Sequence, residues 1–323
     1  MNVFLTGTSG LLGQRVLADL VFDNKVERVI ALYRNKWIGY GSLNMAKVTF
    51  IRGDLRDPNL FSNLYASYGI DAVIHLGANA IVKNSERSIS DTFHTNILGT
   101  VYLLEAAKNA KIDRFIYQST DKVYGEQGEI KYNENSQLKG RNAYELSKVC
   151  ADITAFNFNS FGLKTFCVRC CNMFGPGDLN FSRLIPSAIA YYLRNESPIL
   201  YSDSVNRVRE FINIKDVSNG INSILFYDGK ERIFNLGSGY NNPIPGMFYY
   251  IYARAKNRLK DKLTVPAFVV KSKDVFFPEI DFQAIDYSLA ASELGYVPTT
   301  TINIDAYMDE TIDFYIKYFN YKE

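Results

Sequence analysis

The stretch of sequence that decides the fold is Asn2-Val3-Phe4-Leu5-Thr6-Gly7-Thr8-Ser9-Gly10-Leu11-Leu12-Gly13, directly after Met1. Its first residues form a short apolar run, which is typical of a strand buried on both faces of a parallel sheet. Glycines then recur at every third position, and an apolar helical pattern begins at Leu11. The order of strand, glycine turn and helix predicts the first βα unit of an α/β fold.

The glycine turn also predicts a binding site. Gly7 would allow a tight turn, Gly10 would let the backbone approach a pyrophosphate, and Gly13 would permit close packing of the helix on the strand. Free N–H groups at a helix N-terminus favour an anion there. A purely structural turn is the alternative, but the strand-turn-helix context favours binding. We therefore expect a nicotinamide dinucleotide to contact Gly7, Ser9, Gly10, Leu11, Leu12 and Gly13.

Working outward from this turn, short apolar strands alternate with helical patterns through the first half of the chain. Helices are expected at 11–21, 96–109 and 144–161. Strands are expected at 2–6, 28–33, 48–52, 72–76, 114–119 and 165–169. This alternation predicts βαβ units and a Rossmann-type, doubly wound parallel sheet.

The pattern changes after Asn172, where a loop-like segment is followed by helices and fewer strands. One further strand, 234–237, is expected to return to the sheet. We therefore predict a dinucleotide-binding domain over residues 1–172, with the sheet rejoined near 205–240. A smaller substrate-binding domain over residues 173–323 would be interleaved with it.

Composition excludes several classes of partner. The 323-residue chain has a formal net charge of +2, so no strong field favours nucleic acid or an anionic membrane. We expect no metal site, because two histidines are too few and the cysteines lack a second ligand pair at zinc-site spacing. We see no signal peptide and no membrane-length apolar run in the sequence, so we expect a cytoplasmic protein.

A candidate redox site comes from Tyr144 and Lys148, whose i,i+4 spacing places both on one helix face. The polar strand end Gln118-Ser119-Thr120 precedes them. Tyrosine, with a normal pKa near 10, is a poor base at neutral pH. A neighbouring ammonium and a positive nicotinamide would favour the phenolate. Tyr144 would then remove a hydroxyl proton while hydride leaves the same carbon, and Lys148 would also hold the nicotinamide ribose.

The spacing G-x-x-G-x-x-G resembles that of the extended short-chain dehydrogenase/reductases. In that family a Ser or Thr at the position of Thr120 hydrogen-bonds the substrate hydroxyl. The segment after the third strand contacts the adenine, and the end of the fourth strand borders the cofactor. The resemblance thus implies five further cofactor-binding residues: Asp54, Leu55, Leu76, Gly77 and Ala78.

The choice between NAD and NADP depends on the end of the second strand, Ala31-Leu32-Tyr33-Arg34-Asn35. An acidic residue there would bind the ribose hydroxyls of NAD, but this stretch has none. Arg34 could pair with a 2′-phosphate instead, although a solvated surface arginine is the alternative. The sequence therefore favours NADP over NAD.

A narrower resemblance follows from Thr120-Asp121-Lys122-Val123-Tyr124-Gly125, which is similar to the corresponding stretch of nucleotide-sugar 4,6-dehydratases, above all the CDP-glucose type. The dTDP-glucose enzymes have Asp-Glu where Asp121 and Lys122 stand. The resemblance extends over nearly the whole chain and implies that residues 173–323 bind a nucleotide-diphosphate sugar. Its implied substrate-binding residues are Asn96, Asn172, Arg183 and Arg209.

The resemblance implies a reaction in three stages: oxidation at C4, loss of water across C5 and C6, and return of hydride to C6. Asp121 would be the acid at the C6 hydroxyl, and Lys122 would be the C5 base or would hold Asp121 in position. The product would be a 4-keto-6-deoxy sugar. The site would then comprise the catalytic residues Thr120, Asp121, Lys122, Tyr144 and Lys148.

Two alternatives stay open. A nucleotide-sugar epimerase or 4-dehydrogenase would use the same Thr, Tyr and Lys, with Asp121 and Lys122 only binding substrate. A cofactor-binding regulator without catalysis is disfavoured by the intact Thr120, Tyr144 and Lys148. The resemblance also implies a homodimer through the helices around 96–109 and 144–161. The nucleotide base and the sugar are left undetermined, because fold cannot supply either.

Overall fold

A parallel β-sheet forms the centre of the N-terminal half in the computed structural model, which describes residues 1–35, 45–80, 86, 88–272 and 279–320. Within these ranges it has seven strands in the order β10-β6-β5-β4-β1-β2-β3. They are β1 (Asn2–Thr6), β2 (Arg28–Tyr33), β3 (Val48–Arg52), β4 (Ala72–His75), β5 (Arg114–Gln118), β6 (Lys164–Cys170) and β10 (Ile233–Leu236). The order reverses between β1 and β4, so the carboxyl ends of these two strands form the topological switch point.

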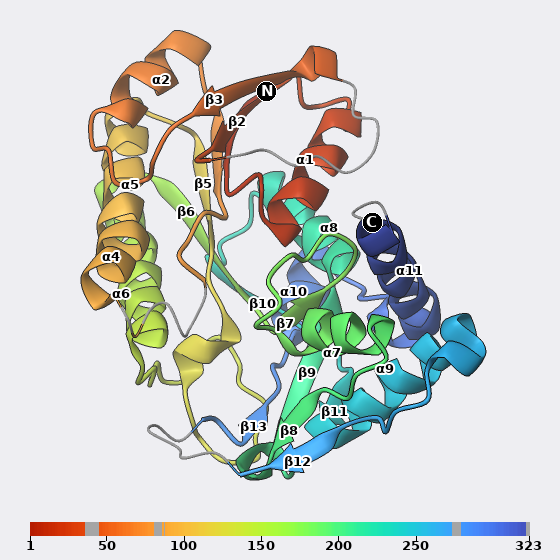
Figure 1. Ribbon diagram of the computed structural model, residues 1–323. Helices are drawn as coiled ribbons and strands as arrows, with labels where there is room; N and C mark the ends of the chain where they lie inside the picture. The colour runs from red at the N-terminus through yellow and green to blue at the C-terminus, as the bar shows by residue number, and fades with distance from the viewer. Residues whose placement is uncertain (36–44, 81–85, 87, 273–278, 321–323) are drawn as a thin grey trace.

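Helices cover both faces of this sheet, as Figure 1 shows. One face packs against α1 (Leu11–Phe22) and α8 (Ile214–Leu225). The other packs against α2 (Leu60–Tyr68), α5 (Gly99–Asn109) and α6 (Ala143–Asn157), with the short α4 (Ile89–Phe93) beside α6. The alternation along β1 explains the two layers, because Val3 and Leu5 belong to the first core and Phe4 to the second.

The C-terminal part has its own core, formed mainly by α7 (Leu184–Leu193), α9 (Ile244–Leu259) and α11 (Thr300–Asn320). A second sheet joins β11 (Asn241–Pro243), β9 (Val208–Asn213) and β13 (Phe282–Gln283), and β7 (Asn172–Phe174) also pairs with β9. A small pair consists of β8 (Ile199–Tyr201) and β12 (Val269–Lys271). The helix α10 (Ser288–Leu294) contacts β10 and α8.

The predicted α/β fold is confirmed, and the six N-terminal strands agree with the expected ranges to within one residue at each end. The expected strand at 234–237 is β10, which pairs in parallel with β6. The expected helix at 96–109 is divided, because a wider helical turn (His94–Leu98) precedes α5. The expected helix at 144–161 ends as an α-helix at Asn157 and continues as a short 3-10 turn (Phe158–Phe161). No helix in the described ranges has both the length and the apolar character needed to cross a membrane.

Candidate active site

The glycine turn lies at the switch point between β1 and β4. Gly7 has a φ of +72°, and a Cβ atom there would stand 2.7 Å from the backbone nitrogen of Gly77. A Cβ on Gly13 would stand 2.0 Å from the carbonyl oxygen of Gly7. The turn is closed by a hydrogen bond from the Gly10 N–H to the Gly7 carbonyl, 3.0 Å. These contacts bring the backbones of β1, α1 and the segment after β4 as close as glycine permits.

A dinucleotide fits this arrangement. Helix α1 begins after Gly10, and no side chain caps it or places an acid in its first turn. Ser9 and Gly10 are exposed, whereas Leu11, Leu12 and Gly13 are buried. Uncapped N–H groups at such a terminus attract a pyrophosphate. Leu55 lies beside this turn as well, because its Cδ1 would be 3.0 Å from a Cβ on Gly77.

A buried hydrogen-bond chain beneath the turn was not foreseen from the sequence. Thr100 Oγ1 donates to the Asn96 carbonyl (2.7 Å) and therefore accepts from His75 Nε2 (3.0 Å). His75 Nδ1 then accepts from Thr6 Oγ1 (2.7 Å), which accepts from the Gly77 N–H (3.0 Å). Burial, together with the charge of Lys148, lowers the pKa of His75 to about 3, so the ring is neutral at physiological pH. These hydrogen bonds hold β1, β4 and α5 together beneath the candidate cofactor site.

The residues expected near the adenosine end lie at the ends of β2 and β3. The Asp54 carboxylate accepts from Arg56 Nε (3.0 Å) and Nη2 (2.8 Å). This pairing holds the pKa of Asp54 below its usual range, and the charge of the exposed Arg34 also contributes. Arg34 is therefore near enough to the Asp54 carboxylate to influence its charge state.

The redox residues come together where β5 ends. Lys148 is buried and donates to the carbonyl of Gln118 (2.6 Å), with its Nζ 4.3 Å from the centre of the Tyr117 ring. The Thr120 side chain lies near enough to Tyr144 to lower the pKa of the phenol, although the two residues lie on different elements. Lys148 lies one helical turn from Tyr144 on α6.

The electrostatics of this pair differ from the expectation. Burial raises the pKa of Tyr144 to about 12, and the cation that most opposes this rise is Arg183. Burial also lowers the pKa of Lys148 to about 7. Lys148 does not offset the rise in the Tyr144 pKa through a hydrogen bond. Its ammonium group donates to a backbone carbonyl, and no hydrogen bond joins it to the phenol in the described structure. In the protein alone, Tyr144 is therefore protonated at neutral pH.

The next residue after Thr120 is a buried acid. Asp121 is 1% exposed and accepts hydrogen bonds from Thr120 Oγ1 (3.1 Å) and from Gln283 Nε2 (3.2 Å). Burial raises the pKa of Asp121 to about 7, although the neighbouring charge of Lys122 and the Thr120 hydrogen bond oppose the rise. Half-buried Lys122 donates its backbone N–H to Thr120 Oγ1 (3.4 Å). A carboxyl group of this kind can hold a proton at neutral pH and release it.

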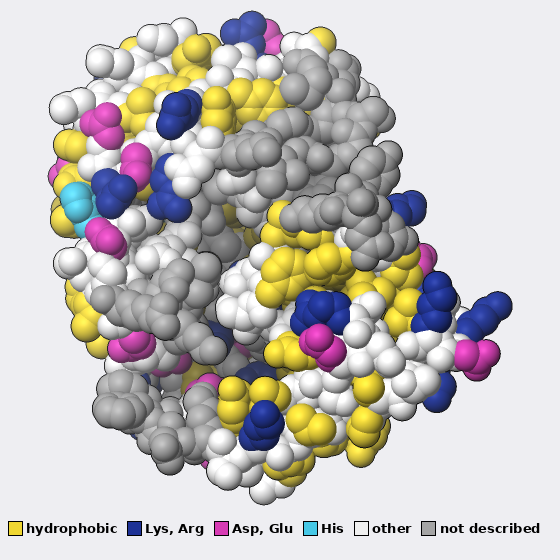
Figure 2. All heavy atoms as spheres, viewed as in Figure 1, with side chains coloured by type: hydrophobic (Ala, Val, Ile, Leu, Met, Phe, Trp, Pro, Cys, Tyr) yellow, Lys and Arg dark blue, Asp and Glu magenta, His cyan; other side chains and the backbone are white. Residues whose placement is uncertain are grey.

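Two arginines reach this region from the C-terminal part. Arg183 precedes α7, binds the Asp178 carboxylate (3.0 Å), and is near enough to Tyr144 to influence its pKa. Arg209 lies on β9 and donates to the carbonyls of Val208 (2.9 Å) and Asp281 (3.3 Å). Figure 2 shows the surface hollowed between the part that carries α4–α6 and the part that carries α7.

Two predicted substrate residues are engaged by the protein itself. Asn96 accepts from the Asn79 N–H (2.7 Å) and donates to the Asn79 carbonyl (3.1 Å) and to Ser147 Oγ (2.9 Å). Asn172 donates to the carbonyl of Glu210 (3.0 Å). The oxygen and the nitrogen of the Asn96 amide both have partners within the protein. Asn96 is therefore better suited to holding the segment after β4 against α6 than to contacting a sugar directly.

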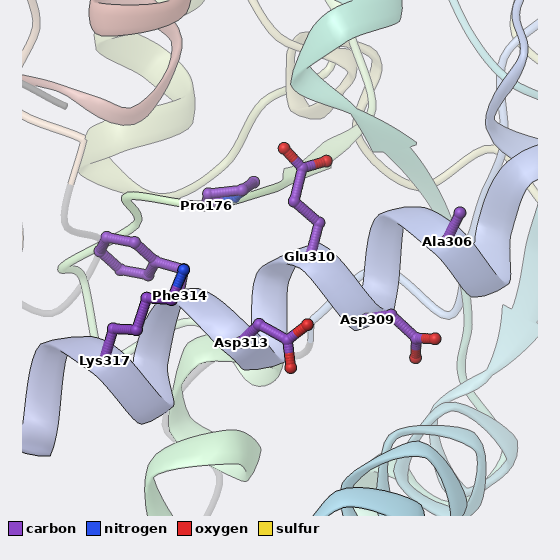
Figure 3. Close-up of a pocket in the computed structure, with 7 residues that line it drawn as sticks. All are labelled: Pro176, Ala306, Asp309, Glu310, Asp313, Phe314 and Lys317. Atoms are coloured by element: carbon purple, nitrogen blue, oxygen red, sulfur yellow. The ribbon is translucent and has the colours of Figure 1, made fainter. Parts of the chain in front are cut away.

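A separate hollow of about 470 Å³ lies between α11 and the loop after β7, where Pro176 faces Glu310 and Phe314 (Figure 3). Its other lining includes Asp309 and Asp313, whose carboxylates pair with Arg254 and Arg258 of α9. None of the candidate catalytic residues lines this hollow. The candidate active site therefore lies apart from this hollow, at the carboxyl ends of β1, β4 and β5.

Comparison with known proteins agrees with this geometry. The profile of the NAD dependent epimerase/dehydratase family matches residues 3–237. The low-salt glycan biosynthesis protein Agl12 of Haloferax volcanii is 33% identical over 245 residues, 74% of this chain and 77% of that protein. A dTDP-glucose 4,6-dehydratase of Streptomyces antibioticus is 29% identical over 312 residues, 92% of this chain and 88% of that enzyme.

Solved structures extend the likeness over the whole chain. The dTDP-glucose 4,6-dehydratase DesIV of Streptomyces venezuelae, solved with NAD bound, has a TM-score of 0.85 at 26% identity and covers 98% of this chain and 97% of its own. A UDP-glucose 4-epimerase of Thermotoga maritima shares the fold, with a TM-score of 0.85 at 22% identity and coverage of 99% and 100%. These findings name NAD, so the preference for NADP is not supported. The glycine turn, the Thr-Tyr-Lys cluster and the family match over 3–237 lead to one conclusion: the chain belongs to the NAD dependent epimerase/dehydratase family.

Proposed function

We propose that this protein is a nucleotide-sugar 4,6-dehydratase that forms a 4-keto-6-deoxy sugar. The observation that carries the proposal is the buried Asp121 carboxyl group, whose pKa of about 7 suits a proton donor, directly beside the Thr120 and Tyr144 pair. C4 oxidation alone requires no such acid. The dTDP- and UDP-glucose 4,6-dehydratases among the relatives support the same reaction class.

The cofactor in this proposal is NAD, held by Gly7, Ser9, Gly10, Leu11, Leu12 and Gly13 at the N-terminus of α1, and by Leu76, Gly77 and Ala78 after β4. Bound NAD supplies the acceptor for the C4 hydride and the donor for C6. Lys148 would hold the ribose next to the nicotinamide. Thr120 would orient the C4 hydroxyl, and the Tyr144 phenol oxygen would take its proton.

The elimination step depends on Asp121 and Lys122. Oxidation at C4 acidifies the C5 proton, which Lys122 would remove, while Asp121 donates its proton to the C6 hydroxyl, which leaves as water. The Lys122 charge also acts on Asp121, so a positioning role for this lysine is the other assignment. Arg183 and Arg209 would bind the diphosphate of the substrate, in the charge-assisted manner usual for arginine and phosphate.

The test is incubation of the purified protein and NAD with a panel of CDP-, dTDP-, UDP- and GDP-sugars, followed by product mass. A dehydratase releases a product lighter by one water, whereas an epimerase or a 4-dehydrogenase does not. In Asp121→Asn, we expect C4 oxidation to survive better than water loss, so that reduced cofactor accumulates in a single turnover. Water loss at the wild-type rate in Asp121→Asn would remove Asp121 from the role of acid.

A wild-type protein that turns over a sugar without losing water would refute the dehydratase proposal and favour the epimerase or dehydrogenase alternative. Bound cofactor with no turnover on the whole panel would favour the non-catalytic regulator. The three outcomes are distinguished by the same mass and absorbance measurements.

A further inference from the structure

The two oxygens of the Asp121 carboxyl group are held from different parts of the molecule. Oδ1 accepts from Thr120 Oγ1, its neighbour at the end of β5. Oδ2 accepts from Nε2 of Gln283, which is 162 residues away in the chain and 1% exposed. Gln283 lies on β13, in the sheet of the C-terminal part. The candidate acid Asp121 therefore has a hydrogen-bond donor, Gln283, that lies outside the Thr-Tyr-Lys cluster.

The strand that carries Gln283 is fixed on both sides. Gln283 is paired in parallel register with Arg209 of β9, so the two side chains leave the same face of this sheet. On the other side, Tyr132 donates its N–H to the carbonyl of Ala284 (3.0 Å) and its hydroxyl to the carbonyl of Phe282 (2.9 Å). Bonds on both flanks thus fix the backbone of the strand from which the Gln283 amide reaches Asp121.

We propose that Gln283 is a positioning residue for the proton of Asp121, and that it determines which carboxyl oxygen carries that proton. The inference rests on the proposed function for the role of Asp121 as acid. The amide N–H that faces Oδ2 can only donate, so Oδ2 must accept. The Thr120 hydroxyl beside Oδ1 donates to the carboxylate form, and it can turn to accept when Oδ1 carries the proton. The proton is thus directed to Oδ1, the oxygen beside Thr120, where the substrate hydroxyl is to be engaged.

The groups around Asp121 indicate in which direction its pKa should move when Gln283 is replaced. Lys122 and Arg209 favour the carboxylate, and Glu210 opposes it. Asp121 in turn acts on four further titratable groups that face it, namely Tyr132, Tyr144, Cys170 and Cys171. A substitution at Gln283 leaves each of these groups in the chain. Donation by the Gln283 amide stabilises the charged carboxylate, so its removal raises the Asp121 pKa.

The experiment replaces Gln283 by methionine, which keeps the length of the side chain and removes the donor. In single turnovers with NAD, we expect the alkaline limb of the water-loss rate to move upward by about one pH unit, while the C4 oxidation rate keeps its wild-type pH profile. Gln127→Met is the matched control, because within the described residues the side-chain amide of Gln127 donates to the carbonyls of Tyr124 and Gln137 and not to Asp121. A role in folding alone would lower both steps without moving the limb.

A second readout does not depend on turnover. The ¹³C signal of the Asp121 carboxyl group, identified by its loss in Asp121→Asn, is titrated in the full-length protein with NAD. An upward shift in Gln283→Met but not in Gln127→Met supports the proposal, even if the wild-type protein releases no dehydrated sugar and the proposed function fails. If Gln283→Met does not fold, Gln283→Glu serves, since a second carboxyl group also raises the apparent pKa. Identical Asp121 titration in the wild type and in the folded Gln283 variant overturns the proposal.

Discussion

At the scale of single residues, the site combines half-buried Tyr144 and buried Lys148, whose pKa values move in opposite directions. Burial raises the pKa of Tyr144 to about 12 and lowers that of Lys148 to about 7. Each shift favours the neutral form, as expected where charged groups are removed from water. A base at Tyr144 therefore needs positive charge close to the phenol, which the described residues supply through Arg183 and which bound NAD would increase.

The corresponding prediction concerns the phenol oxygen. We expect Tyr144→Phe to lower C4 oxidation about 10²–10⁴-fold, the usual contribution of a general base, with the fold unchanged. Tyr117→Phe is the matched control: its ring lies against Lys148, but within the described residues its buried hydroxyl has no hydrogen-bond partner. The measurement is reduced cofactor formed in a single turnover, with circular dichroism to verify folding. Near-normal oxidation by a folded Tyr144→Phe protein would exclude Tyr144 as the base.

At the scale of elements, the cofactor site depends on how closely α1 approaches β1. The Gly13 position sets this approach, because a Cβ there would lie 2.0 Å from the Gly7 carbonyl oxygen and 2.9 Å from the Thr8 Cα. Both are backbone atoms, so the contact can be relieved only by moving the helix. The turn between the two elements would then lose the geometry that aims the α1 N-terminus at a pyrophosphate.

We therefore expect Gly13→Ala to lower the free energy of unfolding by about 1–3 kcal/mol, as overpacking does, and to weaken NAD binding by more than tenfold. Gly246→Ala in α9 is the control, since the nearest atom to its Cβ would be 3.8 Å away. Alanine in that helix should be neutral or stabilising. Urea unfolding and calorimetric titration with NAD give the two quantities, and unchanged NAD affinity in Gly13→Ala would show that the turn does not bind the cofactor.

At the scale of the whole molecule, α6 presents apolar side chains to solvent. Leu146, Ile153 and Phe156 are 40%, 47% and 42% exposed, and their spacing places them along one side of the helix. This is the helix through which we expect a homodimer. Exposed apolar side chains that lie together favour a contact surface, and a second copy of the chain would remove them from water.

The prediction is that the wild-type protein is a dimer and that Ile153→Lys shifts it toward monomer, because a buried lysine without a partner is costly. Ile302→Lys is the control, since Ile302 is 84% exposed on α11 of the C-terminal part. Light scattering over a range of concentrations gives the mass. A dimer of unchanged stability in Ile153→Lys would place the contact elsewhere.

Much of the N-terminal half follows from local sequence. The strands and the turn at Gly7 were predictable because buried parallel strands are short apolar runs and because close backbone contact leaves only glycine as a choice. The pairing of Tyr144 with Lys148 follows from helical periodicity, since residues four apart share a face. The family resemblance then connected Thr120 with this pair, although Thr120 comes close to Tyr144 only in the folded chain.

The tertiary structure decided what depends on distant parts of the chain and on removal from water. The His75 chain joins β1, β4 and α5, and the Gln283 contact with Asp121 joins β13 to the segment after β5 across 162 residues. The pKa shifts of Asp121, Tyr144 and Lys148 arise chiefly from burial. By itself the sequence determined which groups are present and how neighbours along one strand or helix are spaced. Only the folded chain determined which of them meet and how dry their surroundings are, because both depend on packing between elements that no local pattern encodes.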